Sequence, residues 1–265
     1  MNCIFCKENS TDSINLEHII PESLGNKNYI LERGIVCDKC NNYFATKIEK
    51  ILLDIDYYVS LRARNYIKNK RGKIPTERII FHGSDCISEI KRPKNTDILY
   101  IVSNDLNYFE KIINGKNKNM SFSVELMPPF ENYYVSRFLA KVAVEVLALR
   151  LKVHPQGLDY LINEIQFDVI REYARYGKRY ENWPYYVRKI YEEDTLFESI
   201  DHPKVILDRL FEFTIFSTDN CECYLVLIFK GIEYTINIGC PEITSYLNWL
   251  IDNNNVSPLY LNNHR

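Results

Sequence analysis

Four cysteines near the amino terminus are spaced like metal ligands. Cys3 and Cys6 form one Cys-x-x-Cys pair, and Cys37 and Cys40 form another. Zinc prefers tetrahedral thiolate ligands, and such a pair lets two sulfurs bind one ion from a single tight turn. The alternative is that the four cysteines are buried free thiols, because unpaired cysteine is commonly buried. Chance, however, seldom produces two pairs at this spacing. We therefore predict a closed, structural Zn²⁺ site.

Glu17 and His18 lie in the 30-residue interval between the two cysteine pairs. Adjacent side chains of an extended segment point to opposite faces, so one can hold a metal while the other meets a substrate. We expect Glu17 to be the metal ligand and His18 the base, because a neutral imidazole, with an ordinary pKa of about 6.5, accepts a proton near neutral pH. A lone Glu-His pair is more often solvated surface, so this interpretation depends on its position between the cysteines.

Together these motifs resemble the HNH, or ββα-metal, nuclease family, in the zinc-stapled branch written Cys-x-x-Cys, Glu-His-Ile-Ile-Pro, Gly and Cys-x-x-Cys-Asn. The Glu-His-Ile-Ile-Pro motif is residues 17–21, Gly25 follows it, and Asn41 follows the last cysteine. The resemblance covers about residues 1–56. It implies that His18 activates the attacking water, and that Glu17 and Asn41 bind one divalent ion, Mg²⁺ or Mn²⁺.

The chain departs from the family pattern at one position. The family's middle Asn lies nine or ten residues before the last ligand, where this chain has Leu31 or Glu32. That Asn braces the loop that carries the base, and Asn28 is the candidate substitute from a neighbouring turn. An Asn in an exposed Gly-Asn-Lys-Asn turn is, however, more often only a turn former.

Charge is distributed unevenly along the chain, although the net charge is only −2. Residues 62–94 contain ten Lys or Arg and three Asp or Glu, so any surface that binds phosphate is local. A solvated basic helix face is the alternative to a phosphate-binding one. The residues expected to contact nucleic acid are Arg62, Arg64, Lys68, Lys70, Arg71 and Lys73.

The other four cysteines, Cys86, Cys221, Cys223 and Cys240, are scattered. We expect no signal peptide, because the chain begins Met1-Asn2 directly before Cys3, and no apolar run approaches the roughly 18 residues of a membrane helix. These features predict a reduced, cytoplasmic protein without a membrane partner.

Hydrophobic periodicity predicts an α+β protein. We expect an HNH module with a basic extension over residues 1–75 and an α+β C-terminal region over residues 76–265, with a soft boundary near 127–130. The expected strands are short pieces near 15–20 and 34–36, then 78–81, 98–102, 122–126, 205–216, 223–229 and 233–238. The expected helices begin at Asn41 or Asn42, continue from 57 towards 75, and then cover 135–153, 158–176, a short stretch after Pro184, and 241–251.

The sequence therefore predicts metal-dependent endonucleolytic cleavage of DNA, with RNA as the alternative substrate. The C-terminal region is expected to contact a substrate, a trigger, a protein partner or a second copy of the chain. Proteins that resemble this architecture often act in bacterial defence against foreign DNA, so the resemblance implies an antiviral effector. The competing hypothesis is a non-catalytic zinc-knuckle module that binds nucleic acid or protein, which the missing middle Asn favours.

Overall fold

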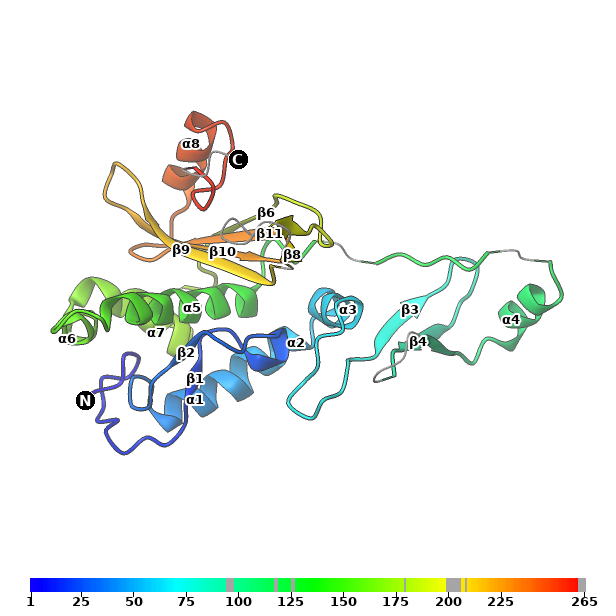
Figure 1. The fold of residues 1–265 in the computed structure, drawn as a ribbon, viewed down its shortest axis with the longest axis horizontal. Coiled ribbons are helices and arrows are strands. Elements are labelled where there is room, and N and C mark those ends of the chain that lie inside the picture. The colour runs from blue at the N-terminus through cyan, green and yellow to red at the C-terminus, as the bar shows by residue number, and fades with distance from the viewer. Residues whose placement is uncertain are drawn as a thin grey trace. The chain divides into compact units, whose positions relative to one another are not determined.

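Helices and strands are mixed along the chain, which confirms the predicted α+β class. The computed structural model describes residues 1–93, 98–116, 119–124, 127–178, 180–198, 206–207 and 209–261 (Figure 1). The chain forms two compact units. Unit 1 contains residues 1–20, 28–52 and 129–265, and unit 2 contains residues 21–27 and 53–128.

These units divide the chain differently from the predicted domains. Most of the N-terminal segment packs in the same unit as the C-terminal half, whereas residues 53–75 fall in unit 2. The predicted boundary after residue 75 does not coincide with a division between units. The chain returns to unit 1 between Pro128 and Pro129.

The N-terminal segment of unit 1 consists of two short strands and a helix. β1 (Glu17–His18) pairs antiparallel with β2 (Ile30–Leu31). Phe44, Ile48 and Leu52 are fully buried at four-residue spacing, as the helical pattern predicts. The helix has three consecutive parts: α1 (Asp38–Phe44), the π-helical η2 (Ala45–Glu49) and α2 (Lys50–Leu53).

This helix begins earlier than predicted. Cys37 is its N-cap, one turn before Asn41 or Asn42, because the Cys37 sulfur accepts a hydrogen bond from the backbone N–H of Cys40 at 3.4 Å. The sulfur accepts a hydrogen bond from the first turn of the helix, which is the role that a Ser, Asp or Asn side chain usually has at the N-cap. The second cysteine pair therefore starts the helix as well as presenting two sulfurs.

Helix α5 (Tyr133–Leu151) is the central helix of unit 1, and its residues 135–148 are all buried. Asn132 caps it by accepting hydrogen bonds from the next backbone N–H groups. A helix buried on every side is expected to be apolar. Arg137, Lys141 and Glu145 break that rule at four-residue spacing and so form one charged line along the helix.

A four-stranded antiparallel sheet in the order β6-β11-β10-β9 packs against α5 (Figure 1). Lys230 and Gly231 both have positive φ, 47° and 82°, and form the predicted turn between the last two strands. Trp183 is buried beside the sheet and donates its indole N–H to the backbone oxygen of Asn237 at 3.0 Å. The strands are β6 (Tyr185–Lys189), β9 (Phe211–Ser217), β10 (Cys223–Phe229) and β11 (Ile232–Asn237).

Two predicted elements of unit 1 are wrong. The second N-terminal strand is β2 rather than 34–36, since Gly34 adopts a φ of +88° and the chain turns there. The short helix predicted after Pro184 is instead strand β6, which pairs with β11. Its alternating burial and its aromatic and β-branched residues suit a strand, and the partner strand lies far along the sequence.

The remaining elements of unit 1 complete its helical layer and one small hairpin. Gly177 ends the helix α7 in the left-handed conformation, as predicted. Within the described residues, no helix is both long enough and apolar enough to cross a bilayer. The elements are α6 (Gly157–Asn163), η3 (Ile165–Phe167), α7 (Asp168–Tyr176), α8 (Thr244–Asp252), and β7 (Phe197–Glu198) paired with β8 (Ile206–Leu207).

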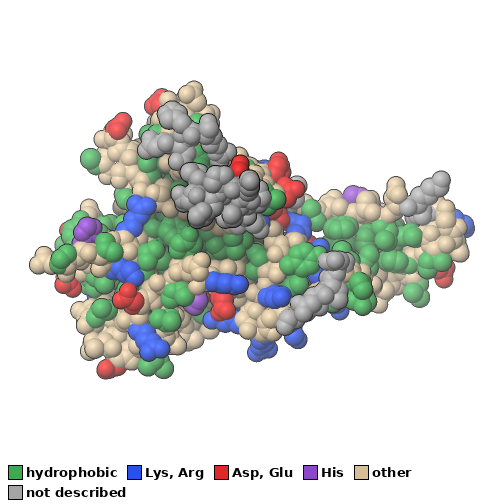
Figure 2. All heavy atoms as spheres, viewed as in Figure 1, with side chains coloured by type: hydrophobic (Ala, Val, Ile, Leu, Met, Phe, Trp, Pro, Cys, Tyr) green, Lys and Arg blue, Asp and Glu red, His purple; other side chains and the backbone are tan. Residues whose placement is uncertain are grey.

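Unit 2 contains a three-stranded antiparallel sheet and has its own core. Ile79, Phe81, Ile90 and Tyr108 are buried together. Figure 2 shows hydrophobic side chains gathered on the surface over β3, β4 and α4. The elements are η1 (Glu22–Leu24), α3 (Asp56–Arg64), β3 (Glu77–Ile80), β4 (Ile87–Lys91), β5 (Tyr100–Val102) and α4 (Leu106–Ile113).

Several predictions in unit 2 need correction. The helix expected to continue towards residue 75 ends at Arg64, and β4 and α4 were not predicted. Of the strand expected at 122–126, Phe122 forms an isolated bridge with Phe81, and residues 125–126 lie outside the described residues. These elements are short and are separated by polar residues, so the hydrophobic periodicity of each one covers too few residues to be recognised in the sequence.

We predict that Gly231→Ala destabilises unit 1, because its new Cβ would lie 2.2 Å from the backbone oxygen of Tyr191 and the φ is positive. The expected loss is about 1–3 kcal/mol of unfolding free energy. Chemical denaturation followed by tryptophan fluorescence measures it, since Trp183 is buried beside the sheet. Gly239→Ala is the control: its Cβ would make only an ordinary 3.7 Å contact. Equal stabilities of the two variants would contradict the account.

Candidate active site

The four cysteines converge in unit 1. Their sulfur atoms all lie within 4.8 Å of one another, and those of Cys6 and Cys37 are 3.6 Å apart. A tetrahedral site with zinc–sulfur bonds of about 2.3 Å needs sulfurs about 3.8 Å apart, so the cluster fits zinc. Cys3 Sγ also accepts backbone N–H groups from Phe5 at 3.5 Å and from Cys37 at 3.3 Å. These donors stabilise thiolates.

Three of the thiols, those of Cys3, Cys6 and Cys40, influence one another's pKa. A hydrogen bond from Cys40 lowers the pKa of Cys3 to about 5, and burial raises the pKa of Cys6 to about 11. The pKa of Cys40 is raised because it keeps the proton that it shares with Cys3. Four adjacent thiolates require a cation, and a bound metal would supply that charge.

Arg175 lies directly against this cluster, which the sequence did not reveal. Its Nε donates to Cys40 Sγ at 3.3 Å, and its guanidinium lies 3.7 Å from the ring centre of Tyr43. Arg175 is itself buried. A zinc ion with four thiolates has a net charge of −2, so a buried guanidinium beside one sulfur is electrostatically favourable. Helix α7 thus supports the cluster from outside.

Strand β1 places Glu17 and His18 on opposite faces. Glu17 is 4% exposed, and its backbone lies opposite buried Leu31 in the strand pair. His18 is partly exposed and lies opposite Ile30. The two adjacent side chains therefore differ in burial, as expected for neighbours on opposite faces of an extended strand.

The ammonium of Lys141, from α5, binds Glu17. The Lys141 Nζ lies 2.7 Å from Glu17 Oε1, 2.8 Å from Glu49 Oε1 and 3.2 Å from Glu145 Oε2. It also donates to the backbone oxygen of His18 at 3.0 Å. Lys141 and Glu145 are fully buried. Three carboxylates from three parts of unit 1 therefore surround one cation.

Burial and charge determine the protonation of this group. Burial alone would lower the pKa of Lys141, but the charges of Glu145, Glu17 and Glu49 raise it well above its ordinary value. Burial raises the pKa of Glu145 and of Glu17, against the attraction of Lys141. These directions favour a charged Lys141 and a protonated Glu145, which reduces the surplus of negative charge.

Asn41 is joined to the segment that leads into β1. Its side-chain nitrogen donates to the backbone oxygen of Leu16 at 3.0 Å. One turn earlier on α1, the carboxylate of Asp38 accepts backbone N–H groups from Ile14 at 3.2 Å and Asn15 at 3.0 Å. The hydrogen bonds from Asn15 and Ile14 lower the pKa of Asp38. Helix α1 thus holds residues 14–16, and with them the start of β1.

Two side chains in or next to β1 carry oxygens of the type that binds hard divalent ions. Glu17 Oε2 is buried and has no hydrogen-bond partner among the described residues. Asn41 adds an amide group beside Leu16, directly before Glu17. Carboxylate and amide oxygens are the ligands that Mg²⁺ and Mn²⁺ prefer.

The other predicted site residues lie elsewhere. Asn28 is exposed, and its backbone oxygen accepts the N–H of Ile30 at 3.1 Å, as in a turn. The basic residues belong to unit 2. Asn69 shapes their turn by accepting N–H groups from Arg71 at 2.9 Å and Lys73 at 3.0 Å. The exposed members are Lys68, Lys70, Arg71 and Lys73, and Arg64 is half-buried.

Arg62 is an exception within the predicted basic group. It is buried, and its Nη1 donates to the backbone oxygen of Leu53 at 3.5 Å. Burial lowers the pKa of Arg62, although the charge of Asp54 opposes this effect. Arg62 therefore contributes to the packing of α3 and does not present its charge at the surface.

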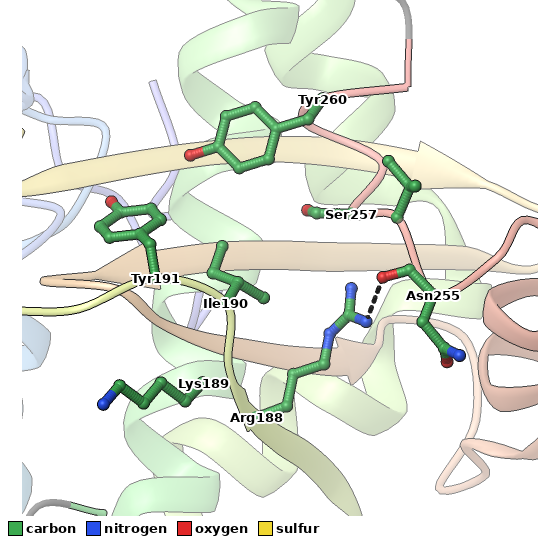
Figure 3. Close-up of a pocket in the computed structure, with 8 residues that line it drawn as sticks. Arg188, Lys189, Ile190, Tyr191, Asn255, Ser257 and Tyr260 are labelled. Atoms are coloured by element: carbon green, nitrogen blue, oxygen red, sulfur yellow. Dashed lines mark hydrogen bonds between the residues drawn. The ribbon is translucent and has the colours of Figure 1, made fainter. Parts of the chain in front are cut away.

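A separate cavity of about 520 Å³ lies in unit 1, and Figure 3 shows Arg188 reaching Asn255 across it. Arg188 binds Glu233 at 2.5 Å and donates to the backbone oxygen of Asn255 at 2.7 Å. Tyr191 donates to Glu212 at 3.1 Å. None of the predicted site residues lines this cavity, which is formed by Arg188, Lys189, Ile190, Tyr191, Asn255, Val256, Ser257 and Tyr260.

Residues 3–54 match the family model for HNH endonucleases. No curated protein and no solved structure matches the chain. The matched segment contains the four cysteines, Glu17, His18 and Asn41. It supports a nuclease-type role with a nucleic-acid substrate, and the cysteine cluster within it supports zinc binding.

We predict that the purified protein contains about one zinc ion per chain and that Cys37→Ser loses most of it, because a closed site needs all four thiolates. Atomic emission spectrometry measures the zinc. Cys221→Ser is the control, since Cys221 is exposed and lies outside the cluster. Zinc-free wild-type protein, or full zinc in Cys37→Ser, would exclude the assignment.

Proposed function

We propose that the protein is a metal-dependent HNH endonuclease that hydrolyses phosphodiester bonds in DNA. The proposal rests on the observation that three features occur together within the matched segment. His18 is partly exposed beside buried Glu17, and Asn41 is hydrogen-bonded to the residue before them. The cysteine cluster joins the start of α1, the helix that carries Asn41, to Cys3 and Cys6 near the amino terminus.

In this proposal His18 takes the proton from the attacking water, and Glu17 with Asn41 holds the divalent ion. A phosphodiester needs a nucleophile in line with its leaving oxygen, and a base within reach of the nucleophile. When bound, Mg²⁺ or Mn²⁺ supplies positive charge where negative charge develops on the phosphate. The four cysteines are fully used as zinc ligands, so they have a structural role.

The charge of unit 2 supports a role in binding nucleic acid. Its residues 21–27 and 53–128 contain fourteen Lys or Arg and ten Asp or Glu, a net charge of +4. Unit 1 has the remaining nineteen and twenty-five, a net charge of −6. Phosphate binding is an electrostatic, local property, so a chain with net charge −2 is compatible with it. We assign the phosphate contacts to the exposed turn at 68–73.

The competing function is a non-catalytic zinc-knuckle module. The observation that favours it is the position of the family's middle Asn: Leu31 is buried opposite Glu17, and Glu32 instead pairs with Lys152 at 2.9 Å. Under either function we propose a cytoplasmic protein whose C-terminal region binds a trigger, a partner or a second copy. A role in antiviral defence belongs to the same proposal.

We predict that wild-type protein nicks supercoiled plasmid in Mn²⁺ or Mg²⁺, and that His18→Ala lowers the rate at least about 100-fold, the usual contribution of a general base. His154→Ala is the control, because His154 is exposed outside the matched segment. Running DNA and RNA side by side identifies the substrate. Equal cleavage by wild type and His18→Ala would refute the catalytic role, and cleavage of RNA alone would refute DNA.

We also predict that replacing Lys70, Arg71 and Lys73 with Ala weakens DNA binding and reduces its dependence on salt. Each phosphate contact that is lost lowers the slope of log K against log salt by about 0.9. Fluorescence anisotropy at several salt concentrations measures that slope. Replacing Lys111 and Lys116, which are exposed elsewhere in unit 2, tests whether any loss of charge has the same effect. An unchanged slope in the first variant would remove the turn from the DNA interface.

A further inference from the structure

We propose that Lys141 is a positioning residue for the candidate metal site: its ammonium fixes the carboxylate of Glu17 and the backbone of His18 in the geometry that binds the divalent ion. The inference rests on the proposed function and assigns a role to a residue outside the segment that matches the HNH family. It makes helix α5 part of the site.

The contacts of Lys141 account for all of its donors. An ammonium has three N–H groups. The nearest acceptors are Glu17 Oε1 at 2.7 Å, Glu49 Oε1 at 2.8 Å and the backbone oxygen of His18 at 3.0 Å. Two of these three belong to the residues proposed to hold the ion and to activate water. Lys141 therefore contacts both the side chain of Glu17 and the backbone of His18.

The way in which Glu17 is bound leaves one oxygen for a metal. Lys141 binds Oε1, while Oε2 is buried without a hydrogen-bond partner within the residues that the structure describes. An unpaired buried carboxylate oxygen is costly, and a cation would remove that cost. A carboxylate held through one oxygen cannot rotate freely, so the other oxygen keeps one direction. Groups that hydrogen-bond to a metal ligand in this way fix its orientation.

Packing alone does not explain a lysine at this position. A buried ion pair seldom stabilises a protein more than apolar residues of similar size would. The neighbouring turn of α5 already joins the helix to the rest of unit 1, because Arg137 donates to the Tyr43 hydroxyl at 2.9 Å and to the Ala174 backbone oxygen at 2.9 Å. The α5 residues around Lys141 are mostly apolar. Lys141 is one of three buried charged residues on this helix, and its ammonium lies 2.7 Å from Glu17 Oε1.

The test separates the orientation of Glu17 from the stability of the fold. Lys141→Met combined with Glu145→Leu removes the ammonium together with the buried carboxyl group one turn away, and fills both places with apolar side chains. Lys141→Arg keeps the charge but presents a planar fork that cannot reproduce the same contacts. Arg137→Met is the matched control, on the same line of α5 but without a contact to Glu17. Zinc content and circular dichroism establish folding.

Electron paramagnetic resonance then measures free Mn²⁺ in titrations of each zinc-loaded protein. We expect the half-saturating Mn²⁺ concentration to rise about 10- to 100-fold in the double variant and in Lys141→Arg, the usual effect of losing a residue that hydrogen-bonds to a metal ligand. Arg137→Met should bind Mn²⁺ like wild type even if it unfolds at a lower temperature. Glu17→Gln should lose the site.

Wild-type Mn²⁺ affinity in either folded Lys141 variant would overturn the positioning role while leaving the proposed function intact. Failure of both variants to fold with zinc would also overturn it, since Lys141 would then be a folding requirement. If wild-type protein neither binds Mn²⁺ through Glu17 nor cleaves DNA, the proposed function itself fails.

Discussion

Unit 1 depends on one buried cation. The Lys141 ammonium is fully buried, and the carboxylates of Glu17, Glu49 and Glu145 lie within 3.2 Å of it. Removing one partner from such a cluster leaves uncompensated charge in a medium of low polarity, so its members constrain one another. The cluster joins the strand that carries His18, the helix after the cysteines, and the central helix α5. None of these three can move independently of the others.

The cysteine cluster provides the second constraint on the same segment. Cys37 is the N-cap of helix α1, and its sulfur lies 3.6 Å from that of Cys6. The same residue therefore begins the helix and brings together the two ends of the segment between the cysteine pairs. Asn41 extends from that helix to Leu16. The short strands β1 and β2, of two residues each, have few hydrogen bonds of their own. The cysteine cluster on one side and the buried ion cluster on the other can hold so small a sheet in place.

Much of the N-terminal site could be predicted from sequence because its information is local. The cysteine pairs, the Glu-His pair and the apolar spacing of Phe44, Ile48 and Leu52 each lie within a few residues. The contact between Lys141 and Glu17 could not be predicted, because the two residues are more than a hundred positions apart in the sequence. A signal was present: three charged residues, Arg137, Lys141 and Glu145, lie four apart in a mostly apolar helix. Strand β6 was missed for the same reason, since its partner β11 follows much later.

The central claim is that His18 acts as the base of a nuclease. The most direct measurement is chemical rescue: plasmid cleavage by zinc-loaded His18→Gly in Mn²⁺, with and without added imidazole. A small free base can replace a missing imidazole where the side chain only transfers a proton. The account predicts that wild type nicks the plasmid, that His18→Gly does not, and that imidazole restores a measurable rate. Cleavage by His18→Gly at the wild-type rate without imidazole would contradict it.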